Sequence, residues 1–378
     1  MKVYERYFAR QIYLTFVFVL FAFSALFFFF DLLSELDSVG QGHYGFGLAV
    51  LRVLLQTPSR FYEIIPVAAL IAAIYVFAMM AANSEYTIFR VSGLSPQRAL
   101  WSLIKLGAPL VALTFLFGEV IGPYTDQFSE RVRLEALGSS VSSDFHSGVW
   151  VKDSDNNTAG QPITRFINVG ELLPDATIRN VRIYEFDQEL RLETIRVAAS
   201  GVFHAPHSWL LSGVTGMNLT RSPAVNNDPL GATYKSSVAN TSEYSMRSEL
   251  TPQILSVLLV SPERMSIYNL FSYINHLREN SQDAQRYQIA LWRKILYPFA
   301  VLVMMVLSLP FAYLHSRAGM VGAKVLGGIM LGMSFQLINT LFSHIGTLNT
   351  WPAPLTAATP ALIYLALALV GLRWVDRH

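Results

Sequence analysis

The stretch IYLTFVFVLFAFSALFFFF, residues 12–30, decides the fold class of this chain. It runs for about 19 residues without a charge, which is the length an α-helix needs to cross the hydrocarbon of a bilayer. Lys2, Arg6 and Arg10 precede it, as in a secretion signal. The run is longer than a signal core, however, and Asp31 to Glu35 follow in place of a small-residue cleavage site. We therefore expect an uncleaved first membrane span.

Five further stretches of this kind follow, at residues 64–82, 100–117, 295–314, 325–342 and 351–372. The stretch 46–55 contains Arg52 and is too short to span, so it is either interfacial or a lead-in to the second span. Composition agrees, because 52% of residues are hydrophobic and 14% are charged, against about a quarter charged in soluble proteins. We predict an α-helical membrane protein with six spans in a 3+3 arrangement around a polar insert.

Basic residues flanking the spans predict the orientation, because cytoplasmic loops are enriched in lysine and arginine. All of these residues fall on one side if both termini are cytoplasmic: Lys2, Arg6, Arg10, Arg90, Arg98, Lys105, Arg317, Lys324, Arg373 and Arg377. Residues 123–290 then lie on the far side. The predicted domains are 1–122 (spans one to three), 123–285 (the external region) and 286–378 (spans four to six).

The external region alternates short β-type segments with turn sequences. Segments 163–169, 177–186, 194–198 and 209–214 are separated by stretches rich in proline, glycine and asparagine. This pattern predicts a β-sandwich or jelly roll over about 145–250. Apolar residues at helical spacing then predict a juxtamembrane helix over about 266–279.

No catalytic or metal-binding pattern is present in the sequence. The phosphate-binding Gly-x4-Gly-Lys-Ser/Thr sequence is absent, so we expect no ATPase in this chain. The chain has no cysteine, its eight histidines are scattered, and no basic block indicates nucleic acid. Asp31 and Glu119 lie near the outer ends of spans one and three, either as interfacial groups or within a functional cavity.

The segment 83–93, between spans two and three, is the most informative short one. Asn83 or Ser84 can cap a short helix and Gly93 can close it. Its apolar residues are unusual for a free loop: Tyr86, Ile88, Phe89 and Val91. The helix either docks on a cytoplasmic partner or packs against its own bundle, and the sequence favours neither.

With these motifs in order, the chain resembles a known family over essentially its whole length. The motifs are Gly40-Gln41-Gly42-x-Tyr44, Ser84-Glu85 through Ser92-Gly93, Gly118-Glu119, Trp150-Val151-Lys152-Asp153, Leu250-Thr251-Pro252, Gln282-Asp283-Ala284-x-Arg286-Tyr287 and Leu291-Trp292-x-Lys294-Ile295-x-x-Pro298. They are similar to the lipopolysaccharide export permeases, LptF and LptG, and more closely to LptG. Their order around six spans carries the resemblance.

The resemblance implies a permease of the inner membrane, with the β domain in the periplasm, that pairs as an LptF–LptG heterodimer. A dimer of cytoplasmic ATPase subunits binds the ATP and Mg, and this chain binds no cofactor. Lipopolysaccharide then leaves the inner membrane along β-jellyroll domains, including that of a single-span LptC-type partner. The alternatives are a permease for another lipid or lipoprotein, a membrane-anchored periplasmic lipid-binding protein, and a proton-driven transporter. The last is disfavoured because no carboxylates pair within a span.

The resemblance also assigns site residues. Glu85 matches the acidic residue of the helix that couples to the ATPase. The predicted coupling residues are Glu85, Tyr86, Ile88, Phe89, Arg90, Ser92 and Gly93. Arg133 matches a basic residue that faces the lipid phosphates. The predicted headgroup rim is Arg52, Arg60, Arg131 and Arg133, each of which can alternatively snorkel at the membrane interface. Possible cavity or structural residues are Asp31, Glu119, Arg286 and Lys294. The chain departs from the family after span one, where lysines are common and Asp31, Asp37 and Ser38 stand here.

Overall fold

The computed structural model divides the chain into two compact units, described separately below. The helical unit comprises Met1–Glu130, Pro262–Phe271 and Ala284–His378, and the β unit comprises Arg131–Ser261 and Ser272–Asp283. The structure describes residues 3–137, 149–156, 162–172, 177–204, 207–222, 233–248, 250–252, 255, 262–279, 282–313, 321–349 and 351–377.

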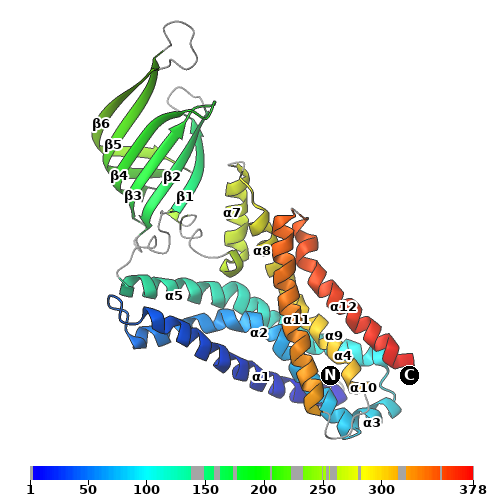
Figure 1. The fold of residues 1–378 in the computed structure, drawn as a ribbon. Helices are drawn as coiled ribbons and strands as arrows, with labels where there is room; N and C mark the ends of the chain where they lie inside the picture. Colours follow the sequence, from blue (N-terminus) through cyan, green and yellow to red (C-terminus); the bar gives the residue numbers. More distant parts are fainter. Residues whose placement is uncertain are drawn as a thin grey trace. The chain divides into compact units, whose positions relative to one another are not determined.

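Six stretches of helix in the described residues are long and apolar enough to cross a membrane, which confirms the predicted spans (Figure 1). The helices that carry them are α1 (Val3–Glu35), α2 (Phe46–Ala82), α4 (Pro96–Phe115), α8 (Gln285–Leu296), α9 (Ala300–Ser308), α11 (Val321–Leu348) and α12 (Ala353–Arg377). The stretch 46–55 belongs to α2, so its reading as a lead-in to the second span is correct. A 3-10 turn, η1 (Leu36–Ser38), follows α1.

Helix α2 forms the centre of the helical unit. Its apolar segment is 78% buried, whereas those of α1, α11 and α12 are 17%, 22% and 22% buried. Glycines bring α11 close to it: a Cβ on Gly328 would lie 2.7 Å from Ile74, and one on Gly332 would lie 2.5 Å from Val67. Small residues at such contacts let membrane helices pack closely. The exposed apolar faces of α1, α11 and α12 suit contact with lipid or with another membrane subunit.

Two of the spans are interrupted. Between α4 and α5 (Gly122–Leu137) the backbone forms a π-helical segment, η2 (Leu116–Ile121). The fourth span is broken at Pro298 and Pro310 into α8, a 3-10 turn η5 (Tyr297–Phe299), α9 and α10 (Pro310–Tyr313). Proline causes the breaks of the fourth span because it cannot donate a backbone hydrogen bond. Pro66, Pro109 and Pro360 lie inside continuous helices.

The β unit contains one antiparallel sheet in the order β1-β2-β3-β4-β5-β6, twisted and curled in Figure 1. The strands are β1 (Val149–Asn156), β2 (Pro162–Leu172), β3 (Ile178–Phe186), β4 (Leu192–His204), β5 (Ser208–Ser222) and β6 (Thr233–Arg247). The predicted inserted β domain is therefore present. Its described strands form an up-and-down sheet, whereas the predicted sandwich or jelly roll has two sheets. Each strand pairs with the next one along the chain, as sequential strands usually do.

The inner face of this sheet carries an apolar cluster and a row of buried charges. Val151, Ile167, Val181, Trp209 and Leu211 belong to the cluster. The register then places three charged residues side by side across β1, β2 and β3: Asp153, Arg165 and Glu185. Arg165 Nε lies 3.0 Å from Glu185 Oε1, and Arg165 Nη1 lies 3.5 Å from Asp153 Oδ2. The acids surround the guanidinium and compensate its burial.

Two short elements complete the described chain. The 3-10 turn η4 (Pro262–Arg264) belongs to the helical unit. Helix α7 (Ile267–Glu279) forms where the sequence predicted a helix over 266–279, and it runs from one unit into the other.

Candidate functional site

The segment between the second and third spans forms a short helix, α3 (Glu85–Val91). It is seven residues long, shorter than the predicted 83–93. Ser84 precedes it in the left-handed conformation and no side chain caps its start, so the predicted side-chain cap is not formed. At its end Gly93 has φ +95°, and the Leu94 amide donates to the Phe89 carbonyl at 3.0 Å. Glycine adopts this left-handed conformation readily, which fixes the end of the helix.

One face of α3 packs against its own bundle. Tyr86 is 1% exposed and lies edge-on to Phe77 of α2 and Tyr313 of α10, with centroid distances of 6.0 and 5.1 Å. Burial raises the pKa of the Tyr86 hydroxyl, so it stays neutral at any physiological pH. Phe89 contacts Phe8 of α1 at 5.3 Å. These aromatic contacts fix α3 to three helices of the unit.

The opposite face of α3 is exposed and apolar. Ile88 is 64% exposed and Val91 is 86% exposed, one helical turn apart. Residues three apart lie on the same face of a helix. Both interpretations of this segment therefore find support: Tyr86 and Phe89 hold the helix to the bundle, while Ile88 and Val91 are available to a partner.

Glu85 lies at the start of α3 and is held by α1. The Tyr7 hydroxyl donates to Glu85 Oε2 at 2.8 Å, and the Asn83 amide donates to Oε1 at 3.4 Å. Arg90 lies over the Tyr313 ring at 4.9 Å. The same end of the unit contains the N-terminus, α10 and the C-terminus (Figure 1). Movement of α3 is thus coupled by direct contacts to α1, α2 and α10.

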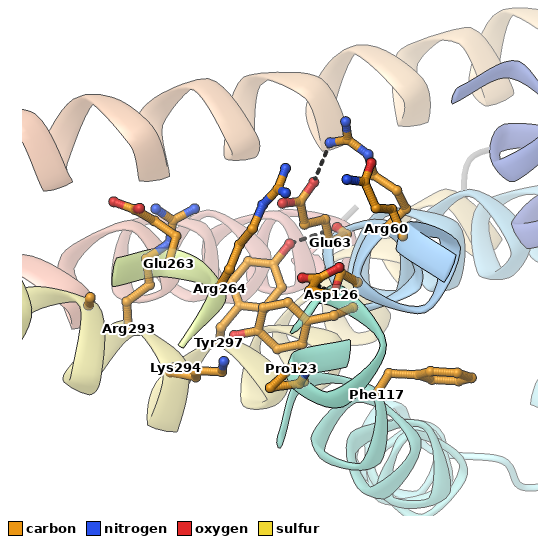
Figure 2. Close-up of a pocket in the computed structure, with 15 residues that line it drawn as sticks. Arg60, Glu63, Phe117, Pro123, Asp126, Glu263, Arg264, Arg293, Lys294 and Tyr297 are labelled. Atoms are coloured by element: carbon orange, nitrogen blue, oxygen red, sulfur yellow. Dashed lines mark hydrogen bonds and ion pairs between the residues drawn. The ribbon is translucent and has the colours of Figure 1, made fainter. Parts of the chain in front are cut away.

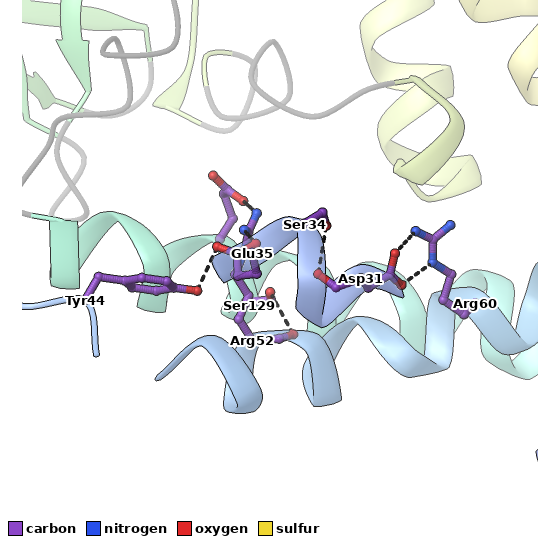
Figure 3. Close-up of polar contacts among 8 residues, drawn as sticks. Asp31, Ser34, Glu35, Tyr44, Arg52, Arg60 and Ser129 are labelled. Carbon is purple, nitrogen blue, oxygen red and sulfur yellow. Dashed lines mark hydrogen bonds and ion pairs between the residues drawn. The ribbon is translucent and has the colours of Figure 1, made fainter. Parts of the chain in front are cut away.

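At the opposite end of α2, acidic residues of α1 pair with basic residues of α2 (Figure 3). Arg60 donates to both oxygens of Asp31, from Nε at 2.9 Å and from Nη2 at 2.7 Å. Arg52 forms an ion pair with Glu35 and a second one with Glu130 of α5, at 3.3 Å. Bidentate and buried pairs of this kind hold helices in a fixed register. Asp31 is therefore a structural partner of Arg60 in this state.

Tyr44 supports the same cluster from the connection between α1 and α2. Its hydroxyl donates to Glu35 Oε1 at 2.9 Å, and its side chain is 1% exposed. Burial, assisted by the Glu35 carboxylate, raises the pKa of the Tyr44 hydroxyl to about 12. The hydroxyl keeps its proton and can donate it at physiological pH.

Glu119 and Lys294 link the third and fourth spans. Lys294 Nζ lies 3.7 Å from Glu119 Oε1 and donates to the Met265 carbonyl. Glu119 Oε2 accepts from the Ile267 amide at 2.8 Å, at the start of α7. Glu119 stands in the π-helical segment η2, a type of irregularity that is often found at functional sites. Gly118 beside it allows close packing, because a Cβ there would lie 2.6 Å from the Tyr62 ring.

A polar pocket of about 60 Å³ opens between α2, α5, α8 and η4 (Figure 2). It has four basic residues in its wall, Arg60, Arg264, Arg293 and Lys294, and three acidic ones, Glu63, Asp126 and Glu263. Tyr62 and Tyr297 form its inner wall, with ring centroids 4.9 Å apart. The Tyr297 hydroxyl donates to the Glu63 carbonyl at 2.7 Å. The pocket suits a charged ligand rather than an apolar one.

Comparison with known proteins identifies the family that has this architecture. The family model for "Lipopolysaccharide export system permease LptF/LptG" matches residues 6–374. This chain belongs to that family. The chain is 29% identical over 368 residues to the lipopolysaccharide export system permease protein LptG of Escherichia coli K12, which covers 97% of both chains. It is 29% identical over 335 residues to the Haemophilus influenzae protein of the same name, which covers 88% of both chains.

The remaining predicted site residues of this permease are dispersed. Arg131 and Arg133 lie on α5 within the β unit, whereas Arg52 and Arg60 lie on α2 of the helical unit. Arg286 is 62% exposed and lies 3.9 Å from Glu263. Headgroup contact by these arginines stays a prediction. At Arg52 and Arg60 such contact must compete with carboxylates of the same chain.

Sequence reasoning missed several residues that the structure brings to these sites. Tyr7 and Phe8 hold α3, Tyr44 holds Glu35, and Arg264 and Arg293 line the pocket. Tyr44 was visible as the end of the Gly40-Gln41-Gly42-x-Tyr44 motif. The others carry no local signal. Glu85, the partner of Tyr7, lies 78 residues away in the sequence, and the residues that line the pocket with Arg264 and Arg293 come from several other elements.

Proposed function

We propose that this permease is the LptG-type membrane subunit of an ATP-driven lipopolysaccharide exporter, with ATP and Mg bound by a separate cytoplasmic ATPase dimer. It pairs with an LptF-type permease and passes lipopolysaccharide from the inner membrane to a periplasmic bridge that includes a single-span LptC-type partner. Both relatives above carry the LptG name, which supports this subunit over the LptF type.

The observation that carries the proposal is the two-faced helix α3. Its aromatic side chains join it to α1, α2 and α10, so force applied to α3 reaches three helices. Its exposed residues, Ile88 and Val91, form an apolar surface at a polar end of the bundle. A helix that presents such residues fits a groove on a soluble partner.

The charge distribution supports a cytoplasmic location for α3. Tyr7 of α1 contacts Glu85, Arg90 contacts Tyr313 of α10, and Lys105 of α4 lies 3.2 Å from Glu5 of α1. The segments with an excess of lysine and arginine therefore meet at one end of the helical unit. By the rule that positive residues stay inside, this end and both termini are cytoplasmic, and the β unit is periplasmic.

The coupling helix is tested with Ile88→Asp combined with Val91→Asp, in the permease co-expressed with its ATPase. We expect loss of ATPase co-purification and of ATP-dependent lipopolysaccharide release from proteoliposomes, because two charges replace the apolar contact. The matched control is Leu190→Asp, which changes a 68% exposed leucine in the turn between β3 and β4, outside the spans. Full release by the double variant would show that α3 does not couple to the ATPase.

A further inference from the structure

One exposed face of α4, continued into α5, consists of the residue types that contact lipid in membrane proteins. Trp101 is 62% exposed and Tyr124 is 77% exposed. From Trp101 to Tyr124 a helix rises about 35 Å at roughly 1.5 Å per residue, close to the thickness of the hydrocarbon. Aromatic residues at both ends of such a stretch mark the two membrane interfaces. Between Lys105 and Tyr124 the exposed positions carry no charge: Ala108, Pro109, Ala112, Leu116 and Val120.

Lys105 lies on this face, one turn beyond Trp101, and its side chain is 62% exposed. Its Nζ lies 3.2 Å from Glu5 Oε1 of α1, and the same oxygen accepts from the Ser102 hydroxyl at 3.4 Å. The ammonium group therefore reaches back to the level of Ser102, beside Trp101, as long basic side chains do at a membrane interface. An ammonium group has three N–H donors, so the contact with Glu5 leaves two of them for a ligand.

Arg98 lies one turn before Trp101, and residues three apart share a helix face. It is exposed, and it forms no ion pair within the described part of the chain. Its Nη1 donates to the Gly93 carbonyl at 3.2 Å, a neutral group that fixes the direction of the guanidinium without cancelling its charge. Arg98 and Lys105 therefore place a net positive charge on both sides of the Trp101 indole, where the apolar face begins.

The ligand that matches this surface has a negative headgroup and apolar chains. Arginine and lysine bind phosphate oxygens through charged hydrogen bonds, and the small side chains of Ala108 and Ala112 leave room for an acyl chain beside α4. A soluble anion would use the cations but not the apolar face. A zwitterionic lipid would bring its own ammonium group to Arg98 and Lys105, which repel it. An anionic phospholipid satisfies both parts of the surface.

We propose that the face of α4 around Arg98, Trp101 and Lys105 binds an anionic glycerophospholipid. The lipid belongs to the leaflet at the end of the helical unit that contains α3 and both chain termini (Figure 1). That this leaflet is the cytoplasmic one rests on the proposed function, whereas the binding chemistry does not. The bound phosphate contacts the side chains that hold Gly93 at the end of α3 and Glu5 at the start of α1, so the lipid acts on the position of both helices.

The test uses the full-length permease in detergent micelles, without ATPase or lipopolysaccharide. Native mass spectrometry measures the binding of phosphatidylglycerol and of phosphatidylcholine with the same acyl chains. We expect the first phosphatidylglycerol to bind at least fivefold more tightly than phosphatidylcholine. Arg98→Gln weakens phosphatidylglycerol about fivefold, and its combination with Lys105→Gln weakens it at least tenfold, because each basic residue near an anionic lipid strengthens binding about fivefold.

Two further variants separate the site from misfolding and from general charge attraction. Arg98→Lys combined with Lys105→Arg keeps both charges and recovers most of the binding, so a loss in the Gln variants reports charge. The matched control is Arg6→Gln combined with Arg10→Gln, which removes two exposed arginines one turn apart on α1 at the same end of the unit. This control changes the binding of phosphatidylglycerol less than twofold.

Four outcomes overturn the proposal. Equal binding of the two lipids would exclude an anionic ligand and leave this face to a partner helix. Undiminished binding in the double Gln variant of α4 would exclude the site, and an equal loss in the control would show unspecific attraction to the basic end. Displacement of the lipid by glycerol 3-phosphate would show that the site takes a free phosphate. Failure of lipopolysaccharide release in the complete exporter, with the lipid preference intact, would instead count against the proposed function alone.

Discussion

Removing Glu35 tests the buried charge cluster that joins α1 to α2. Glu35 pairs with Arg52, whose side chain is 10% exposed, and Glu35 itself is 11% exposed. Glu130 is a second partner of Arg52 at 3.3 Å, but it is 35% exposed. Since Tyr44 also donates to Glu35, Glu35→Ala leaves both an undercompensated cation and a buried hydroxyl without an acceptor.

The expected cost follows from these contacts. Removing one partner of a buried ion pair costs about 3–5 kcal/mol, and the lower end applies because Glu130 remains. The orphaned Tyr44 hydroxyl adds about 1 kcal/mol, so Glu35→Ala destabilises the permease by about 4 kcal/mol. Glu130→Ala removes only the more exposed partner and costs below about 1 kcal/mol. Tyr44→Phe costs about 1 kcal/mol, and its combination with Glu35→Ala costs less than the sum.

The free energy of unfolding is measured by titrating the purified permease from mild detergent into dodecyl sulfate, followed by tryptophan fluorescence and circular dichroism. Asp37→Ala is the matched control, because Asp37 is an exposed acid two residues further along. The reasoning is refuted if Glu130→Ala costs as much as Glu35→Ala, or if both lie within about 0.5 kcal/mol of the unaltered protein.

Two further predictions use the same titration, and a third uses hydrogen exchange. Gly118→Ala puts a Cβ 2.6 Å from the Tyr62 ring and lowers the free energy of unfolding by about 1–3 kcal/mol. In the control Gly327→Ala the Cβ meets nothing within 4 Å, so this variant is neutral or stabilising. Equal effects of the two variants would contradict the close packing at Gly118. The pKa of Tyr44 is about 12 in the folded state against 10.0 ordinarily, so the folded state keeps a proton that the unfolded state loses. The free energy of unfolding therefore has its full value below pH 10 and falls toward pH 12. Tyr44→Phe should flatten this decline with pH, and an unchanged slope would count against the role of Tyr44. Arg165→Ala removes the cation between Asp153 and Glu185. Because Arg196 stays paired with Glu185, the cost is at the lower end of the range for a buried pair, about 3 kcal/mol, seen as faster hydrogen exchange in β1 to β3. The exposed Arg191→Ala costs below about 1 kcal/mol, and similar exchange in both variants would refute the difference.

Spans were predictable because membrane insertion depends on hydrophobicity summed over about 20 residues. The span ends were not, since a helix continues wherever its backbone bonds are satisfied: α1 begins at Val3, well before residue 12. The single sheet also escaped prediction, because alternating strands show which residues face inward but not how many sheets they form.

Pairings between distant charges were the least predictable features. The sequence shows Asp31 and Arg60, but their pairing depends on the rotation of α1 against α2, which no local pattern specifies. The exposed and buried faces of α3 became distinct only through its contacts with Phe77 and Tyr313. Residues of six separate elements line the pocket, so no single sequence motif predicts it.

The pairing of Asp31 with Arg60 shows what the acids at this end of α1 do. Asp31 and Glu35 neutralise Arg60 and Arg52 of α2. Two arginines that the sequence offers to a lipid headgroup are therefore already engaged by carboxylates of the same chain. An anion that binds at Arg52 or Arg60 has to displace these carboxylates, so the ion pairs hold α1 against α2 until such a ligand competes for them.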